Sequence, residues 1–244
     1  MGQHGKRYEA ARNEIDREAT YSPLTAVQML KAFPAAKFDE TVEVHFRLGL
    51  NVRHADEQLR GTLMLPHGTG KDVRIAVFAE GDKAREAEEA GADIVGSADL
   101  AKRIEEGFTD FDVAIATPDQ MGNVGKLGRV LGPCGLMPNP KTGTVTFEVG
   151  KAVRDAKAGK LEYRTDRGAN VHVSIGKKSF DERALVENYA AVVDEIIRAK
   201  PAAAKGRYIR QVTLTSTMGP GIHVDPAKIR GILEELEERQ AVSA

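Results

Sequence analysis

Hydrophobic and polar residues alternate with a period of two in three stretches that lie near the two ends of the chain. These stretches are residues 41–48, 171–175 and 208–217. A period of two predicts strands with one apolar, buried face and one polar face. In the first stretch the inward positions are Val42, Val44, Phe46 and Leu48. The outward positions of all three are Thr41, Glu43, His45, Arg47, His172, Ser174, Gln211, Thr213, Thr215 and Thr217.

The segments around these strands predict helices and two further strands, one of which covers residues 61–65 and stops at Pro66. A charged helix is expected over residues 6–19, and a second helix begins at Ser22-Pro23, where a capping serine precedes a proline in the first turn. Residues 181–198 have the spacing of a long amphipathic helix. Residues 161–165 predict a strand that pairs with the strand at 171–175 around the turn between them.

The middle of the chain has a different pattern, in which short apolar strands alternate with helices. The strands are expected at residues 73–78, 94–95 and 112–117. This order indicates βαβ units and a small parallel sheet that is covered on both faces. The sequence therefore predicts two domains of mixed α/β and α+β class. Residues 1–67 and 160–244 form a discontinuous α+β sheet domain, and residues 68–159 form an inserted α/β domain.

Composition and charge narrow the class of protein. Hydrophobic residues make up 41% of the 244 residues and charged residues 29%, as in soluble globular proteins. Apolar runs stay far below the ~20 residues that span a bilayer, so no membrane association is predicted. A single cysteine fits a reducing compartment and hence the cytoplasm. The net charge of −1 does not by itself indicate a nucleic-acid partner.

Charge is distributed unevenly along the chain. Residues 68–159 contain 12 basic and 15 acidic residues, a net charge of −3, and the remainder carries +2. Four of the acids outside the insertion lie in the segment 234–238, which is expected to be a solvated helix. Balanced totals can therefore conceal a basic face on the terminal halves.

The motifs of common enzymes are absent from the sequence, and neither catalytic residues, a metal site nor a cofactor is predicted. The segment 67–71 has two glycines and a lysine, but its spacing differs from that of a P-loop and Asp72 follows it. A hinge is the better interpretation.

The main alternative function is a nucleotide-dependent enzyme, which would need a glycine loop after the first parallel strand. Residues 78–82 contain acids there instead.

A segment rich in glycine and proline carries the most distinctive signal. Residues 121–143 contain six glycines, three prolines and three cations. They predict a long ordered loop, which is either a turn-rich cap or a loop that contacts RNA or phosphate. The residues themselves leave these two alternatives equal.

The sequence from Met121 to Val145 resembles the signature of the bacterial L-one (uL-one) family, the first protein of the large ribosomal subunit. Residues 65–71, 160–167 and 215–221 extend the resemblance over nearly the whole chain. It implies a discontinuous first domain with a Rossmann-like insertion, and a protein that is a monomer when free. It also implies binding to large-subunit ribosomal RNA in the mobile stalk beside the exit site for deacylated tRNA. Repression of its own operon through the messenger is implied as well, with a location in the cytoplasmic ribosome.

The resemblance also implies which residues contact RNA and which allow movement. Outward hydroxyl groups can hydrogen-bond to ribose 2′-hydroxyls. The carboxylates of Glu43 and Asp166 can accept a hydrogen bond from a 2′-hydroxyl or a base amine. The implied hinge glycines are Gly68, Gly70 and Gly159. Alternation would turn Met218 into the core, whereas the Gly-Pro-Gly turn after it favours the surface position that we expect. The implied RNA-binding residues are Lys37, Phe38, Thr41, Glu43, Arg164, Thr165, Asp166, Arg167, Ser174, Thr215, Thr217, Met218 and Gly219.

Overall fold

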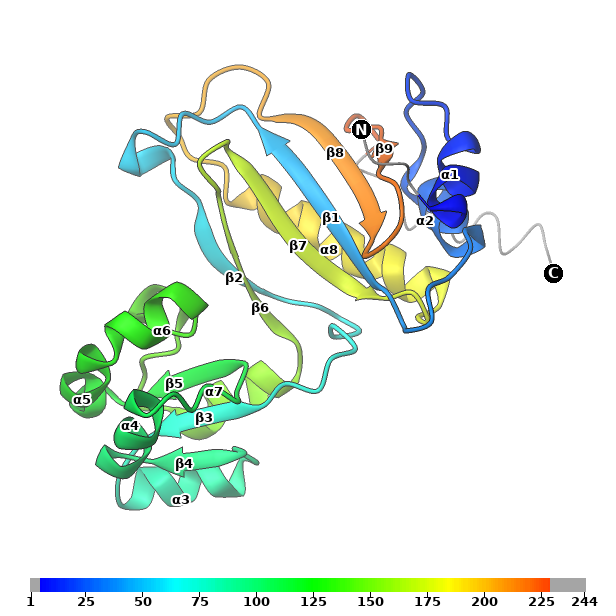
Figure 1. Ribbon diagram of the computed structural model, residues 1–244. Helices are drawn as coiled ribbons and strands as arrows, with labels where there is room; N and C mark the ends of the chain where they lie inside the picture. Colours follow the sequence, from blue (N-terminus) through cyan, green and yellow to red (C-terminus); the bar gives the residue numbers. More distant parts are fainter. Residues whose placement is uncertain (1–4, 229–244) are drawn as a thin grey trace. The chain divides into compact units, whose positions relative to one another are not determined.

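The computed structural model describes residues 5–228, which form two compact units (Figure 1). The first unit comprises the described residues up to Gly70 together with those from Tyr163 onward, and the second unit is Lys71–Glu162. The acidic segment 234–238 lies outside the described residues. No helix within residues 5–228 combines the length and apolar character needed to cross a membrane.

The first unit is built on a four-stranded antiparallel sheet with one face covered by helices. Helix α8 (Glu182–Arg198) lies behind the sheet in Figure 1, and helix α2 (Pro23–Ala32) packs against α8 and against the β8 and β9 side of the sheet. Both helices were expected from the sequence, and Ser22 caps α2 by accepting a hydrogen bond from the Thr25 backbone N–H at 3.3 Å. The strand order is β7-β1-β8-β9, with β1 Thr41–Leu48, β7 Asn170–Lys177, β8 Ile209–Ser216 and β9 Ile222–Val224.

The alternating pattern of β1 is confirmed by burial. Its inward residues are at most 2% exposed, and the intervening positions are partly or fully exposed. Helix α1 (Lys6–Asn13) is shorter than the predicted helix over 6–19. The chain turns after α1 because Asp16 accepts a hydrogen bond from the Glu18 N–H, while its own N–H donates to the Tyr21 hydroxyl at 3.0 Å.

The predicted pairing of residues 161–165 with 171–175 is wrong. Strand β6 (Lys160–Arg164) instead forms a two-stranded sheet with β2 (Arg60–Met64), and β7 pairs with β1. Only a single bridge joins Thr165 to Val171. The reason is a competing partner, because the Thr165 N–H donates to the Leu59 carbonyl at 3.0 Å.

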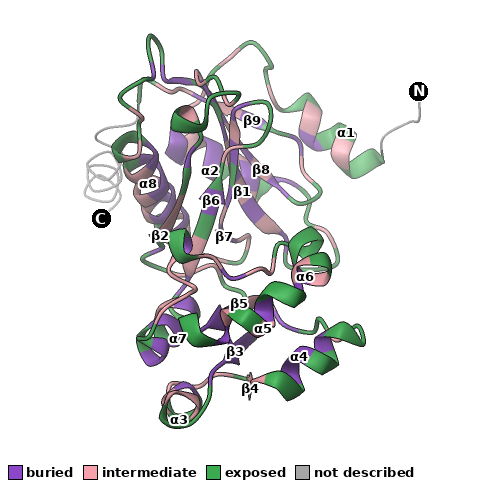
Figure 2. Cartoon of the chain, turned by 90° about the vertical axis from the view of Figure 1, so that its left-hand side faces the viewer, coloured by how far each residue is buried: buried purple, intermediate pink, exposed green. Residues whose placement is uncertain are grey.

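The second unit contains the three-stranded parallel sheet that the sequence predicts. The order is β4-β3-β5, with β3 fully buried at the centre. Alternate β3 residues contribute to two apolar clusters, one on each face of the sheet. In Figure 2 the surrounding helices α4 and α7 show both buried and exposed sides. The elements are β3 Ile75–Phe78, α3 Asp82–Glu89, β4 Ile94–Gly96, α4 Ala98–Glu105, β5 Val113–Ala116 and α7 Val149–Lys157.

The long loop predicted for residues 121–143 is largely helical, which corrects the sequence interpretation. Two short helices, α5 (Met121–Lys126) and α6 (Gly128–Cys134), occupy its first half. Val124 in α5, Leu131 in α6 and Leu127 between the two helices are completely buried in one apolar cluster. Helix α6 ends at Cys134 and is capped by Gly135, whose φ of +73° suits a glycine.

Candidate RNA interface

In Figure 1, no described helix of the first unit lies across the face of β7, β1 and β8 that is opposite to α8. Polar side chains cover this face because each strand turns its apolar residues toward the helices. We call it the open face. Its residues are Thr41, Glu43, His45, Arg47, His172, Ser174, Gln211, Thr213 and Thr215, with His223 on the edge strand.

The register of the sheet brings together five of the residues predicted from the sequence. Glu43 lies opposite Ser174 on β7 and opposite Thr215 on β8. Residues opposite one another in an antiparallel sheet have side chains about 5 Å apart. Thr41 lies at the adjacent end of β1, where its carbonyl accepts the Thr217 N–H at 3.0 Å. These five residues form one continuous surface.

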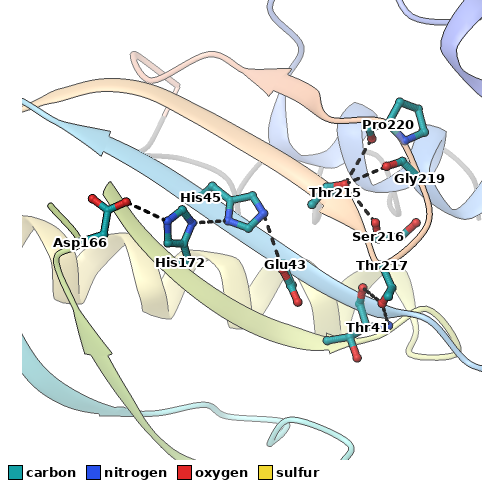
Figure 3. A network of polar contacts seen from close by, with 10 residues as sticks. All are labelled: Thr41, Glu43, His45, Asp166, His172, Thr215, Ser216, Thr217, Gly219 and Pro220. Carbon is teal, nitrogen blue, oxygen red and sulfur yellow. Dashed lines mark hydrogen bonds and ion pairs between the residues drawn. The ribbon is translucent and has the colours of Figure 1, made fainter. Parts of the chain in front are cut away.

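The hydroxyl of Thr217 closes the end of the sheet. It accepts the Thr41 N–H at 2.9 Å and donates to the Thr41 carbonyl at 3.3 Å (Figure 3). Thr41 differs, because its hydroxyl acts as an acceptor, from Lys177 Nζ at 3.0 Å, and its own O–H remains able to donate. Thr217 therefore shapes the edge of the open face, and Thr41 retains a donor for a ligand.

Thr215 and Gly219 define the turn that follows β8. The Thr215 hydroxyl points at the carbonyls of Ser216, Gly219 and Pro220, at 3.1, 3.3 and 3.5 Å (Figure 3). A Cβ atom on Gly219 would lie 2.5 Å from Ser216 Oγ, so no larger residue fits without displacing Ser216. The two residues fix the backbone on both sides of Met218.

Two large apolar side chains are exposed at this end of the sheet. Met218 is 61% exposed and Phe38 is 53% exposed. The interpretation of Met218 as a core residue is therefore wrong, because the turn ends the alternation of β8 before this residue. Lys37, beside Phe38, is also exposed. Exposed apolar side chains next to polar ones are typical of binding surfaces.

The predicted residues 164–167 lie at the opposite end of β7. The ends of β7, Asn170 and Lys177, are roughly 23 Å apart at about 3.3 Å per residue, and residues 164–167 lie beyond Asn170. Thr165 bonds to Leu59 through its hydroxyl, so its side chain belongs to the framework. Arg164 and Arg167 are exposed and able to meet phosphates.

Asp166 builds the turn between β6 and β7. Its carboxylate accepts the N–H groups of Gly168 and Asn170 at 2.8 and 2.7 Å, and the Asn170 amide at 3.0 Å. Burial alone would raise the pKa of this carboxyl, but these hydrogen bonds lower it below its ordinary value. Asp166 is therefore an ionised group that orders the turn.

A histidine pair at the centre of the open face was not among the predicted site residues. The Nδ1 atoms of His45 and His172 are 2.8 Å apart, and one ring must donate to the other. Glu43 lies 3.7 Å from His45 Nε2, and Asp166 lies 3.5 Å from His172 Nε2 (Figure 3). Alternation placed both rings outward, but their pairing depends on the register between strands.

The pair makes stability depend on pH. Burial, followed by the charge of His172, lowers the pKa of His45, although Glu43 partly opposes this. The folded state then binds a proton less readily than the unfolded state, so stability is retained above the ordinary histidine pKa of about 6.5 and falls as the pH drops through the folded value. We expect the free energy of unfolding, measured by urea titration, to fall more between about pH 8 and pH 5.5 in the wild type than in His45→Gln. An equal fall in the two proteins would contradict this expectation.

The glycines predicted as hinges have local structural requirements. Gly68, Gly70 and Gly159 have φ values of +64°, +68° and +99°. A Cβ atom on Gly70 would lie 2.7 Å from the Phe180 ring. The Gly68 carbonyl accepts from the Asn188 amide at 3.0 Å. Proline, with its φ near −65°, fits none of these positions. A proline variant would therefore disrupt the local backbone and could not isolate an effect on movement about these glycines.

Fold and surface together define a protein with an α+β unit that bears an open polar face and a separate parallel α/β unit. Residues 30–220 match the family described as the Ribosomal protein L1p/L10e family. The chain is 58% identical over 230 residues to the large ribosomal subunit protein uL1 of Frankia alni, covering 94% of this chain and 97% of that protein. It is 59% identical over 234 residues to the protein of the same name from Saccharopolyspora erythraea, covering 96% and 98%. The chain belongs to this family of ribosomal proteins, which confirms the resemblance seen in the sequence.

Proposed function

We propose that this chain is a structural constituent of the large ribosomal subunit and binds large-subunit ribosomal RNA through the open face and the turns beside it. Family membership supports the assignment to the ribosome. The observation that carries the RNA surface is the position of Phe38 and Met218, both exposed, beside a face of hydroxyl and carboxylate groups.

The chemistry of this face favours recognition of RNA over simple attraction to phosphate. Thr41 offers a hydroxyl proton, and the Glu43 carboxylate, whose side chain is 43% exposed, accepts from a 2′-hydroxyl or a base amine. Met218 and Phe38 supply flexible and aromatic surfaces that pack against sugars and bases. Arg164 and Arg167 supply positive charge at the far turn.

The proposal extends to the finer roles that the family resemblance implies. Residues 1–67 and 160–244 act as the RNA-binding domain, and residues 68–159 act as an inserted domain that moves about Gly68, Gly70 and Gly159. The protein then forms the mobile stalk of the cytoplasmic ribosome and aids release of deacylated tRNA. Its own messenger competes for the open face when it presents the same RNA fold, which represses translation of the operon.

Substitution of the exposed apolar side chains tests the RNA surface directly. Phe38→Ala and Met218→Ala are each expected to weaken binding to a large-subunit RNA fragment by about 5- to 30-fold, or roughly 1–2 kcal/mol. The salt dependence of binding should stay unchanged because no phosphate contact is removed. Gel-shift titrations at several salt concentrations measure both quantities.

The chain offers matched controls at other exposed positions. Phe147, 57% exposed, lies in the second unit, and Met64, 50% exposed, lies on β2. Phe147→Ala and Met64→Ala should bind the RNA within about twofold of the wild type. Equal losses in all four variants, or wild-type binding no tighter than to an unrelated RNA of the same length, would contradict the proposed surface.

A further inference from the structure

A buried carboxylate lies beneath the end of the sheet where Phe38 and Met218 are exposed. Glu40 is only 2% exposed, although it immediately precedes β1 in the sequence. Its Oε1 accepts the Ala36 N–H at 2.8 Å. Its Oε2 accepts the Ser216 hydroxyl at 2.7 Å and the Met218 N–H at 3.1 Å. Three donors therefore converge on one side chain.

These donors come from two segments that are remote in sequence. Ala36 precedes Phe38 by two residues, and Met218 lies 178 residues beyond Glu40. One carboxylate thus fixes the backbone on both sides of the gap between the two exposed apolar side chains. Separating the two segments would leave buried donors without their acceptor, which is energetically costly. The two segments are therefore held rigidly together while all three hydrogen bonds are made.

Neighbouring residues preserve the ionised form of Glu40. Burial alone would raise the pKa of this carboxyl, but its hydrogen bonds and the positive charge of Lys178 lower it below the ordinary value. The Lys178 ammonium donates to the Phe33 carbonyl at 2.8 Å, and the Lys178 N–H donates to the Glu40 carbonyl at 2.8 Å. Glu40 therefore remains an acceptor for all three donors at neutral pH.

Gly219 leaves the space that this arrangement needs. Ser216 is 4% exposed, and its hydroxyl occupies the position that a Cβ atom on Gly219 would crowd. The Gly219 N–H donates to the Ser216 carbonyl at 3.0 Å, so the turn folds back over this serine. The glycine that the sequence indicated as an RNA contact also makes room for the bond between Ser216 and Glu40.

We infer that Glu40 is a positioning residue for RNA binding: it holds the segments of Phe38 and Met218 at the spacing at which both side chains contact one RNA. The inference rests on the proposed function. Glu40 itself is too buried to meet the RNA, so its effect is exerted through the residues that it holds. This separates it from Glu43, whose carboxylate is exposed on the open face.

Glu40→Gln is the direct test because it preserves the size of the side chain and replaces one of the two acceptor oxygens by an NH₂ group. The glutamine amide nitrogen is a donor, so at least one of the three converging donors loses its partner. We expect a loss of RNA affinity of about tenfold or more, measured by gel shift on protein shown to be folded by circular dichroism and tyrosine fluorescence. Ser216→Ala is the milder variant, with an expected loss of about threefold or more.

Asp39→Asn is the matched control on the neighbouring residue. Asp39 also accepts two hydrogen bonds, from the Ser179 N–H at 3.1 Å and the Ser179 hydroxyl at 2.7 Å, but these bonds do not reach the segment of Met218. Its RNA affinity should stay within about threefold of the wild type. An equal loss in Asp39→Asn and Glu40→Gln would overturn the inference, as would wild-type affinity in Glu40→Gln.

A double-mutant cycle separates positioning from general destabilisation. In a Met218→Ala background, Glu40→Gln should cost less than about threefold, because the side chain it positions has been removed. The same tenfold cost in both backgrounds would overturn the inference. If Phe38→Ala and Met218→Ala bind like the wild type, the proposed RNA surface itself fails. If they weaken binding and Glu40→Gln does not, only the role of Glu40 fails.

Discussion

Replacing Asn188 by alanine is expected to lower the free energy of unfolding of the first unit by about 3 kcal/mol. Asn188 is completely buried in α8. Its amide accepts the His67 N–H at 3.1 Å and donates to the carbonyls of Gly68 and Ile175 at 3.0 and 2.7 Å. Each such bond contributes about 1 kcal/mol net, and their loss leaves backbone groups of the segment 67–68 and of β7 without partners.

The composition of the chain provides a selective probe for this measurement. The sequence contains no tryptophan, and its tyrosines all fall within the first unit, at Tyr8, Tyr21, Tyr163, Tyr189 and Tyr208. Tyrosine fluorescence during urea unfolding therefore reports that unit. Asn170→Ala is the control, since its side chain makes one exposed bond to Asp166 at 3.0 Å and should cost less than about 1 kcal/mol. Equal costs for both variants would show that Asn188 does not anchor this segment.

The strands of the first unit could be predicted because one face of the sheet is buried and the other is not. That asymmetry appears directly as alternation, and β1 begins and ends at the residues where the alternation does. The outward hydroxyls and the two outward histidines followed from the same pattern. The position of Met218 depended on the turn after it, which Gly219 and Thr215 determine.

The remaining features depend on partners that are distant in sequence. The pairing of His45 with His172 spans 127 residues, and the bond between Ser216 and Glu40 spans 176. No spacing rule within one segment connects such residues. The pairing predicted for β6 failed for the same reason, because its actual partner near Leu59 lies 106 residues away. The sequence could therefore indicate which residues face outward, but not which of them meet.

Residues 121–143 show a different limit, in which composition concealed periodicity. Frequent glycines and prolines are typical of loops, and they outweighed the apolar spacing of Val124, Leu127 and Leu131. Burial of these three side chains against β3 and β5 offsets the low helix propensity of the glycines. Packing therefore decides the structure of this segment.

Leu131→Ala is expected to destabilise the second unit by about 2–5 kcal/mol, the range for truncating a fully buried leucine. The side chain is completely buried in the cluster that contains Phe78 and Leu127. Faster amide hydrogen exchange in β3 (Ile75–Phe78) would report the loss, because these amides lie at the centre of the unit. RNA affinity should remain that of the wild type, since the open face lies in the first unit.

Arg129→Ala is the control that separates a structural cap from a loop that contacts RNA. Arg129 is exposed on α6, two residues before Leu131, so its loss should change stability by no more than about 0.5 kcal/mol. A cap requires Leu131 for folding and does not require Arg129 for RNA binding. A loop that contacts RNA would show the reverse, with weaker binding and a smaller salt dependence in Arg129→Ala and little change in the exchange of β3 in Leu131→Ala. The buried leucine favours the first result.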